Sequence, residues 1–225
     1  MIVLENINKI YEQDSIETVA LKEVSLTIAQ GEFACLAGPS GSGKTTLLNL
    51  IGCLDRPTTG SVRLNGQEVS SLKPTAAAEV RRQTIGFVFQ SYNLIPVLSV
   101  YENVEYVLLL QEVDSCQRKK MVMEALNSVN MEDYRDRRPN QLSGGQQQRV
   151  AVARAIVAHP PVVLADEPTG NLDSKNGSEL INLFKKLNHE LSSTFLFSSH
   201  DPRVINNAQR VILLEDGMIA ADRHK

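Results

Sequence analysis

The segment that most constrains the fold of this chain is a glycine-rich loop, Gly38–Thr45. It matches the phosphate-binding pattern G-x-x-x-x-G-K-[ST] at every fixed position. An apolar run at 33–37 precedes the loop and a helix-like run at 45–51 follows it, so the loop is predicted to join a strand to a helix. Such a loop directs successive backbone N–H groups inward and forms an anion site. The alternative, a Gly/Ser-rich turn without function, does not account for the two flanking elements.

The side chains of this segment complement the backbone site. Lys44 is expected to reach the β- and γ-phosphates of a nucleotide as a mobile cation. Thr45 offers a hydroxyl to Mg²⁺, and Thr46 is placed to hydrogen-bond on the α-phosphate side. The nucleotide-binding residues predicted here are Gly38, Pro39, Ser40, Gly41, Ser42, Gly43, Lys44, Thr45 and Thr46.

Two carboxylates follow the apolar run 161–165, which is typical of a buried parallel strand. Ligands bind at the carboxyl ends of such strands, where Asp166 and Glu167 stand. Asp166 is predicted to hold Mg²⁺ through water, and Glu167 to act as general base for an attacking water. The alternative is that both carboxylates only cap a loop.

A second phosphate-binding element is predicted at Leu142–Gln146. Ser143 can cap a helix predicted over 147–158, while Gly144 and Gly145 leave its N-terminus accessible. A bare helix N-terminus binds phosphate through free N–H groups and the helix dipole. One nucleotide needs only one phosphate loop, so the presence of two such elements requires an explanation.

Three further residues stand at strand ends. Gln90 is a neutral amide directly after the buried strand predicted at 85–89. His200 follows the strand predicted at 194–199, where a ring N–H can meet a γ-phosphate. Tyr11 ends the first strand-like run, and it either stacks on a purine base or is an ordinary strand-end tyrosine.

The rest of the chain reads as β-structure over 1–31 and as helices over 99–135, with Ser99 and Glu102 at capping-box spacing. The helical block interrupts the strand–helix alternation and predicts a helical subdomain. The segment 91–98 is unusually apolar for a loop, so it is either a partner surface or a loop packed into the core. Other predicted elements are a hairpin at 61–66, helices at 76–82 and 177–191, and a closing hairpin at 211–220.

Composition excludes several classes of protein. A chain of 225 residues suits one domain, and a net charge of -3 gives no indication of a nucleic-acid partner. The three cysteines form no C-x-x-C pair, and Cys35 and Cys53 read as core residues, which indicates a reducing compartment. No apolar run approaches the roughly 20 residues that span a bilayer, and no signal peptide is present, so a cytoplasmic location is expected.

From about residue 2 to 222 the chain resembles the ATP-binding subunits of ATP-binding cassette (ABC) transporters. The motifs that carry the resemblance are Gly38–Thr45 (Walker A), Gln90 (Q-loop), Leu142–Gln146 (signature), Val162–Glu167 (Walker B), Asn171–Asp173 (D-loop) and His200 (switch histidine). The resemblance implies an α/β phosphate-loop NTPase fold. Its parts are a RecA-like mixed sheet, an N-terminal antiparallel β-subdomain and a helical signature subdomain. One domain would then span 1–225, with the helical part at about 91–160.

The same resemblance implies ATP hydrolysis with ATP and Mg²⁺, and it favours adenine stacking for Tyr11. The implied catalytic residues are Glu167, His200, Lys44 and Gln90, and the implied metal ligands are Thr45, Gln90 and Asp166. In this family two copies pair head to tail, which explains the second phosphate-binding element. Ser143, Gly144, Gly145 and Gln146 of each copy close on the ATP held by the other. The further implied partner is a transmembrane permease, which would hold the chain at the inner face of the membrane.

Segments 54–60, 85–96 and 165–173 are similar to the macrolide-exporter and lipoprotein-releasing group of the family. One departure is Ser198-Ser199, where Val-Thr or similar is commoner. Alternatives are an ABC ATPase that regulates another membrane complex, such as a cell-division permease, and a DNA-repair ATPase or a small-molecule kinase. The repair type needs a long coiled coil between phosphate loop and signature, but Lys44 and Ser143 are 99 residues apart (143 − 44). A kinase needs no Leu-Ser-Gly-Gly-Gln segment.

Overall fold

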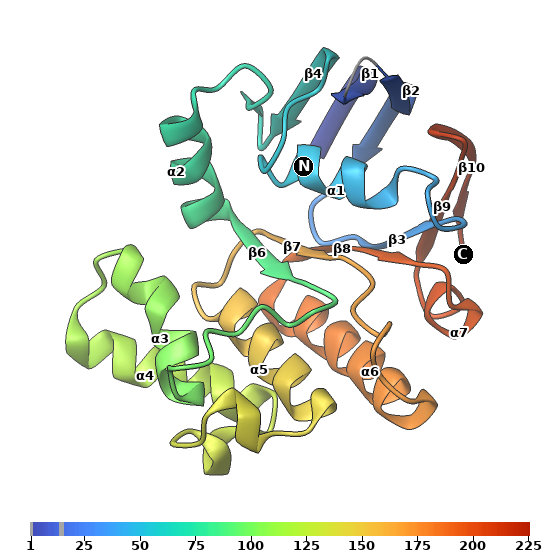
Figure 1. Ribbon diagram of the computed structural model, residues 1–225. Coiled ribbons are helices and arrows are strands. Elements are labelled where there is room, and N and C mark those ends of the chain that lie inside the picture. Colours follow the sequence, from blue (N-terminus) through green and yellow to red (C-terminus); the bar gives the residue numbers. More distant parts are fainter. Residues whose placement is uncertain (1, 14–15) are drawn as a thin grey trace.

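The computed structural model describes residues 2–13 and 16–225, and its strands form two sheets (Figure 1). One is an antiparallel sheet of order β2-β1-β4-β5, with β1 (Ile2–Gln13), β2 (Ile16–Ile28), β4 (Thr59–Leu64) and β5 (Gln67–Glu68). Asn65 and Gly66 join β4 to β5 with φ angles of 49° and 84°. Positive φ at both central residues is what a type I′ hairpin turn requires, so the predicted Asn-Gly hairpin is confirmed.

The other sheet has the order β10-β9-β3-β8-β7-β6 and is parallel except for β10, which runs antiparallel to β9. Its strands are β3 (Phe33–Ala37), β6 (Ile85–Val88), β7 (Val162–Ala165), β8 (Thr194–Ser199), β9 (Arg210–Glu215) and β10 (Met218–His224). The residues of β3, β7 and β8 are all buried, as expected for a parallel sheet covered on both faces. The predicted mixed sheet and the antiparallel N-terminal sheet are both confirmed.

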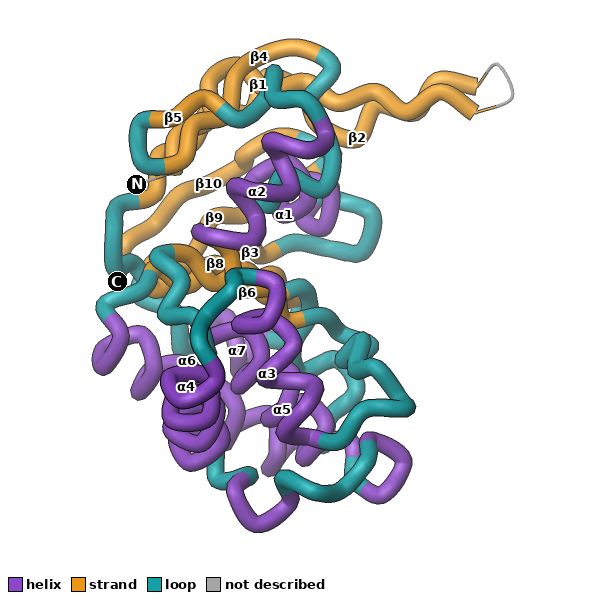
Figure 2. The backbone as a smooth tube through the Cα atoms, turned by 90° about the vertical axis from the view of Figure 1, so that its left-hand side faces the viewer, coloured by secondary structure: helices purple, strands orange, loops and turns teal. Residues whose placement is uncertain are grey.

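Helices cover the six-stranded sheet unequally (Figures 1 and 2). Helices α3, α4, α5 and α6 lie on one face, whereas α1 and the antiparallel sheet lie on the other. The helices are α1 (Lys44–Ile51), α2 (Pro74–Thr84), α3 (Val100–Leu110), α4 (Ser115–Ser128), α5 (Gly144–Ile156), α6 (Ser174–Leu191) and α7 (Pro202–Ile205), with 3-10 turns η1 (Glu132–Tyr134) and η2 (Pro139–Gln141).

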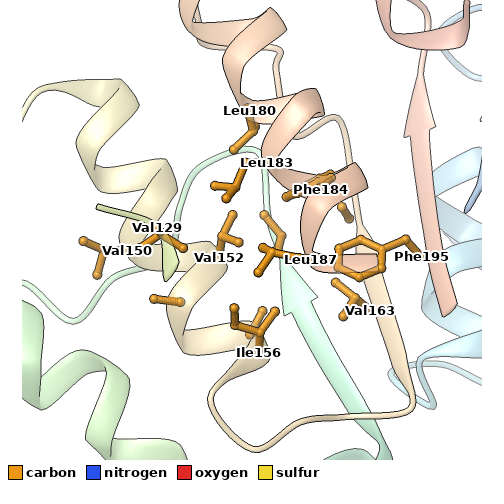
Figure 3. Packing of buried hydrophobic residues seen from close by; sticks show 14 of the residues in the cluster. Val129, Val150, Val152, Ile156, Val163, Leu180, Leu183, Phe184, Leu187 and Phe195 are labelled. Atoms are coloured by element: carbon orange, nitrogen blue, oxygen red, sulfur yellow. The ribbon is translucent and has the colours of Figure 1, made fainter. Parts of the chain in front are cut away.

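Two apolar clusters, one on each face of this sheet, hold the layers together. Phe33 and Cys35 of β3 belong to the cluster under α5 and α6, while Ala34 and Leu36 belong to the cluster under α1. This alternation follows from the period of two along a strand. Figure 3 shows Leu187 of α6 between Val152 of α5 and Phe195 of β8 in the first cluster. Burying a side chain of this size contributes about 1.5–3 kcal/mol.

Helix α5 begins earlier than the sequence predicted. It spans Gly144–Ile156 rather than 147–158, so both glycines lie in its first turn. The Ser143 hydroxyl accepts from the Gln146 N–H (3.3 Å), and the Gln146 side chain accepts from the Ser143 N–H (2.9 Å). This capping box fixes the start of the helix at Gly144, which outweighs the low helix propensity of glycine.

The apolar loop 91–98 was predicted to be either a partner surface or a loop packed into the core, and each alternative holds for part of it. Leu94 packs against the core cluster, whereas Val97 has an exposed fraction of 70%. Asn103 of α3 fixes the loop, because its buried amide bonds the backbone of Ile95 (2.8 and 3.1 Å) and the carbonyl of Leu98 (3.1 Å). The segment is therefore an ordered loop that presents one large apolar side chain to solvent. The Ser99 capping box predicted at the start of α3 is confirmed.

The three cysteines lie in different surroundings. Cys35 of β3 and Cys53, just after α1, are buried, as predicted. Burial raises the pKa of the Cys35 thiol to about 12 and that of Cys53 to about 11. Cys116, in the first turn of α4, is exposed.

Candidate active site

The loop between β3 and α1 takes a backbone path that only glycine can follow at two positions. Gly38 has a φ of 149°, and a Cβ there would lie 2.2 Å from the carbonyl oxygen of Leu214. Gly43 has a φ of 99°, and its Cβ would lie 2.6 Å from the carbonyl oxygen of Ala20. The loop is thus pressed against neighbouring strands and leaves its other side for an incoming anion.

Lys44 lies under this loop, with an exposed fraction of 6%. Its Nζ donates to the carbonyl oxygens of Gly38 and Pro39, each at 2.8 Å. The same Nζ lies 3.9 Å from Oε1 of Glu167. The ammonium group is therefore held beside the loop and next to the predicted general base.

Three oxygen-bearing side chains meet at the ends of β7 and β8. Thr45 Oγ1 lies 3.1 and 3.0 Å from the two carboxylate oxygens of Asp166. Ser198 Oγ donates to Asp166 Oδ1 at 2.7 Å and accepts the N–H of Glu167 at 2.9 Å. Sequence reasoning did not assign Ser198 to the site. The available signal was a small polar residue in a buried strand, two positions before His200.

The donor set of Thr45 and Asp166 suits Mg²⁺. Within residues 2–13 and 16–225, no group of three or more His, Cys, Asp or Glu side chains is placed to hold a metal ion. Mg²⁺ needs no such cage where one or two protein oxygens act together with substrate phosphates and waters. A hydroxyl beside one carboxylate is such a pair, so these residues fit the ion.

Glu167 follows Asp166 in a backbone conformation unusual for a non-glycine residue, with a φ of 45°. Its Oε1 lies 3.0 Å from Nδ1 of His200, and its side chain has an exposed fraction of 15%. Gln90 lies close by, because a Cβ on Gly170 would meet its amide nitrogen at 2.8 Å. The amide of Asn171 donates to the Gln90 carbonyl oxygen at 3.0 Å.

A cavity of about 350 Å³ joins these groups. It is lined by Thr18, Val19, Ala20, Ser40, Gly41, Gly43, Lys44, Thr45, Thr46, Gln90 and Glu167. This size falls within the range of about 300–1,000 Å³ usual for small-molecule sites. The phosphate loop, the predicted base Glu167 and Gln90 thus line one cavity.

Tyr11 stands at the rim of this cavity, because its strand partner Thr18 is one of the lining residues. Its hydroxyl donates to Asp55 Oδ2 at 2.8 Å, and Lys9 Nζ lies over its ring, 4.6 Å from the centroid. Burial, followed by the hydrogen bond to Asp55, raises the pKa of the Tyr11 hydroxyl. The pKa of Asp55 is lowered, since hydrogen bonds from Lys9, Arg56 and Tyr11 outweigh the opposing effect of burial.

The signature residues lie elsewhere. Of the residues that the structure describes, the cavity beside the phosphate loop includes none of Ser143, Gly144, Gly145 and Gln146. Gly144 instead lies beside the Tyr92 hydroxyl, and Gly145 beside the Asn176 side chain. Within one chain, the two predicted phosphate-binding elements therefore do not form one site.

Proteins in which such a loop lies beside a strand-end aspartate and glutamate are phosphate-loop nucleoside triphosphatases, and this fold and site correspond to that class. Comparison with known proteins narrows the class. The family described as "ABC transporter" matches residues 21–170. The chain therefore belongs to the ABC transporter family, as an ATP-binding cassette with ATPase activity.

Relatives support the assignment along the whole chain. An uncharacterized ABC transporter ATP-binding protein of Thermotoga maritima is 47% identical over 96% of this chain and 92% of its own length. A macrolide export ATP-binding/permease protein, MacB, of Syntrophobacter fumaroxidans is 43% identical, but this chain spans only 31% of that protein. A dimeric post-hydrolysis structure of the cassette MJ0796 bound to ADP and Pi is 44% identical with a TM-score of 0.92, covering 100% of this chain and 98% of that one.

None of the helices in the described part of the chain is long and apolar enough to cross a membrane.

Proposed function

We propose that two copies of the chain close head to tail around ATP, and that this closure drives a transmembrane permease of the exporter or lipoprotein-releasing type. One observation carries the proposal: the signature helix and the phosphate loop each suit phosphate, yet they do not share a cavity within one chain. A second copy supplies the missing half of each site. Residues 1–225 would act as one ATP-binding domain, with the helical part at about 91–160.

In this proposal the chain's own groups position the reactants and stabilise charge, which is most of what phosphoryl transfer needs. Lys44 and the loop N–H groups hold the β- and γ-phosphates. Glu167 takes a proton from the attacking water. Nδ1 of His200 lies 3.0 Å from Glu167, so only the imidazolium has a second N–H, on Nε2, for a γ-phosphate oxygen.

Mg²⁺, when bound, neutralises charge on the phosphate oxygens, and Thr45, Asp166 and Gln90 are proposed to hold it. The His200–Glu167 contact fixes the carboxylate close to the phosphates. Hydrolysis and phosphate release then remove the charge that bridges the copies and let the dimer open.

A groove between α2, β6, α3 and α5 is the proposed binding site for the permease. Its volume is about 480 Å³, and apolar side chains dominate its lining, among them Leu54, Phe87, Phe89, Val107 and Leu110. Phe89 directly precedes Gln90, so the groove adjoins the nucleotide cavity along the chain. Relatives named MacB combine ATP-binding and permease parts in one protein, which supports a permease partner. The chain would then lie at the inner face of the membrane, without a nucleic-acid partner.

The dimer is tested with Glu167→Gln. This change keeps the shape of the side chain but removes the basic carboxylate, so the turnover rate should fall about 10²–10⁴-fold while ATP still binds. Trapped ATP that binds only the paired state should stabilise it by mass action. In gel filtration, the variant should run as a dimer with ATP and as a monomer with ADP.

The control is a second substitution in the Glu167→Gln background. Ser143→Arg places a bulky side chain at the start of α5 and should abolish the ATP-dependent dimer. Asn127→Arg, at an exposed position of α4, adds the same charge to another helix and should leave the dimer intact. A monomer at saturating ATP and millimolar Mg²⁺ in the Glu167→Gln variant contradicts the head-to-tail model. Turnover at the wild-type rate contradicts the role of Glu167.

A further inference from the structure

Asp55 hydrogen-bonds the hydroxyl of Tyr11, whose ring is proposed to stack on adenine, although the two residues are far apart in the sequence. Its Oδ2 accepts the Tyr11 hydroxyl at 2.8 Å, and its Oδ1 accepts from Lys9 Nζ at 2.8 Å. Lys9 is largely buried, with a side-chain exposed fraction of 12%, and its Nζ also donates to the Arg56 carbonyl oxygen at 2.8 Å. Lys9, Tyr11 and Asp55 thus form one contact group, which we name the ring clamp.

The ring clamp fixes both the tilt and the free face of Tyr11. The hydrogen bond to Asp55 holds the hydroxyl end, so the ring cannot swing about its side-chain bonds without breaking that bond. Lys9 Nζ lies over the ring, 4.6 Å from its centroid, and a cation at this distance is attracted to the π-face. One face of the ring is thereby covered, while 40% of the residue remains exposed for a flat partner.

Asp55 is itself fixed to helix α1. The N–H groups of Leu54 and Asp55 both donate to the carbonyl oxygen of Asn49, at 2.9 and 3.3 Å. The Arg56 N–H donates to Asp55 Oδ1 at 2.7 Å. Helix α1 starts at Lys44, so it carries the phosphate loop at one end and the ring clamp at the other.

We propose that Asp55 is a positioning residue for the nucleotide base. It holds Tyr11 at a fixed place relative to the phosphate loop, through helix α1, and so sets the affinity for the adenine part of ATP. The inference rests on the proposed stacking role of Tyr11. A purely structural role, in which the Lys9–Asp55 ion pair only ties β1 to α1, predicts different behaviour in the following test.

The test compares two probes that share phosphates but differ in the base: ATP and inorganic tripolyphosphate. Tyr11→Phe keeps the ring and removes the hydroxyl that donates to Asp55, and Asp55→Ala removes the acceptor. Each should weaken ATP binding about 3- to 10-fold, the effect of losing one hydrogen bond, and raise KM by the same factor. Tripolyphosphate affinity and kcat should stay within about twofold of wild type, because no residue of the phosphate loop is changed.

Two variants separate positioning from structure. In a Tyr11→Ala background, Asp55→Ala should add nothing further, since there is no ring left to position. Asp55→Asn keeps an acceptor oxygen and should restore part of the ATP affinity. The control is Glu5→Ala, which breaks another ion pair of β1, with Arg63 at 3.7 Å, and should change neither affinity.

Each contrary outcome overturns a different statement. Equal weakening of ATP and tripolyphosphate by Asp55→Ala overturns the positioning role and assigns Asp55 to structure alone. An undiminished effect of Asp55→Ala in the Tyr11→Ala background shows that it does not act through the ring. If Tyr11→Ala leaves ATP affinity unchanged, the stacking role fails and the inference falls with it. The dimer test with Glu167→Gln is independent of that result.

Discussion

At the scale of single residues, Ser198 links the two acidic residues of the candidate site. Its hydroxyl bonds the carboxylate predicted to hold Mg²⁺ and the backbone of the predicted general base (2.7 and 2.9 Å). The side chain is fully buried. Ser198 therefore fixes Asp166 and Glu167 relative to each other. Among the residues that the structure describes, no other side chain hydrogen-bonds both Asp166 and Glu167.

Ser198→Ala should lower the rate of ATP hydrolysis about tenfold, because loss of a buried hydrogen-bond partner costs about 1–3 kcal/mol. Part of the loss should be recovered at higher Mg²⁺ concentration, since Asp166 loses the donor that orients it. Steady-state ATPase assays over a Mg²⁺ series measure both effects. Ser199→Ala is the matched control, because Ser199 is equally buried but bonds only the Asp201 N–H. Equal rates for the two variants contradict the role of Ser198.

At the scale of secondary-structure elements, one arginine joins several strands. Arg210 of β9 donates to Asp222 of β10 (2.8 and 2.6 Å), to Glu32 just before β3 (2.9 Å) and to the carbonyl oxygen of Thr27 in β2 (2.8 Å). The guanidinium is largely buried, with a side-chain exposed fraction of 10%. The edge of the six-stranded sheet and the end of β2 are therefore held by the same side chain.

Asp222→Asn should destabilise the fold by about 1–2 kcal/mol at pH 7, because it weakens charge-assisted bonds to a buried arginine. Hydrogen bonds from Arg210 hold the pKa of Asp222 below its ordinary value, so the carboxylate stabilises the fold above the unfolded pKa of about 3.9. That stability is lost as the pH falls through the folded pKa, and the difference between wild type and variant should shrink below about pH 4.

Urea unfolding midpoints measured over a pH series test this prediction. Asp136→Asn is the control, because Asp136 has a side-chain exposed fraction of 90% and pairs with Arg135 only at 3.6 Å. Such a surface pair is expected to contribute little at any pH. A destabilisation by Asp222→Asn that is the same at pH 7 and pH 3 disagrees with an electrostatic origin.

At the scale of the whole molecule, the nucleotide cavity and the proposed permease groove adjoin the same strand end of β6. Leu110→Glu places a carboxylate in the groove and should weaken assembly with the permease at least tenfold, since burying a charge in a contact between apolar side chains is costly. The basal ATPase rate should stay unchanged, because Leu110 does not touch the nucleotide cavity. Co-purification with a permease encoded by a neighbouring reading frame measures assembly.

The neighbouring residue supplies a close control for that experiment. Leu109 has a similar exposed fraction, 45% against 53% for Leu110, but does not line the groove. Leu109→Glu should therefore assemble normally. If Leu110→Glu also assembles normally, the permease binds another surface of the chain.

The sequence predicted the parts of this molecule that a local pattern encodes. Strand β8 was predicted from an apolar run, and the cap at Ser99 from its capping-box spacing to Glu102. Ser143 was predicted as a helix cap from its residue type. Thr45 and Asp166 were each predicted to hold Mg²⁺ from their own motifs, and the structure places the Thr45 hydroxyl 3.1 Å from the Asp166 carboxylate. Local patterns of this kind need no knowledge of the tertiary structure.

Contacts between distant segments were not predicted. Asp55 lies 44 residues from Tyr11, and nothing in either local pattern indicates their hydrogen bond. Ser198 looked like any small residue of a buried strand. The loop 91–98 had two possible interpretations from the sequence. Only tertiary packing places Leu94 against the core and Val97 in solvent. The start of α5 was misplaced because glycine argues against helix, while the capping box argues for it.

The contrast between the cysteines has a practical consequence. A maleimide reacts with the thiolate form, so Cys35 and Cys53, buried and with raised pKa, are protected from it at neutral pH. Cys116 is exposed at the start of α4, on the opposite side of the six-stranded sheet from α1. The chain without any substitution should therefore be labelled with one dye per copy, at Cys116. Energy transfer between two labelled copies then reports in real time how the pair closes and reopens during each round of hydrolysis.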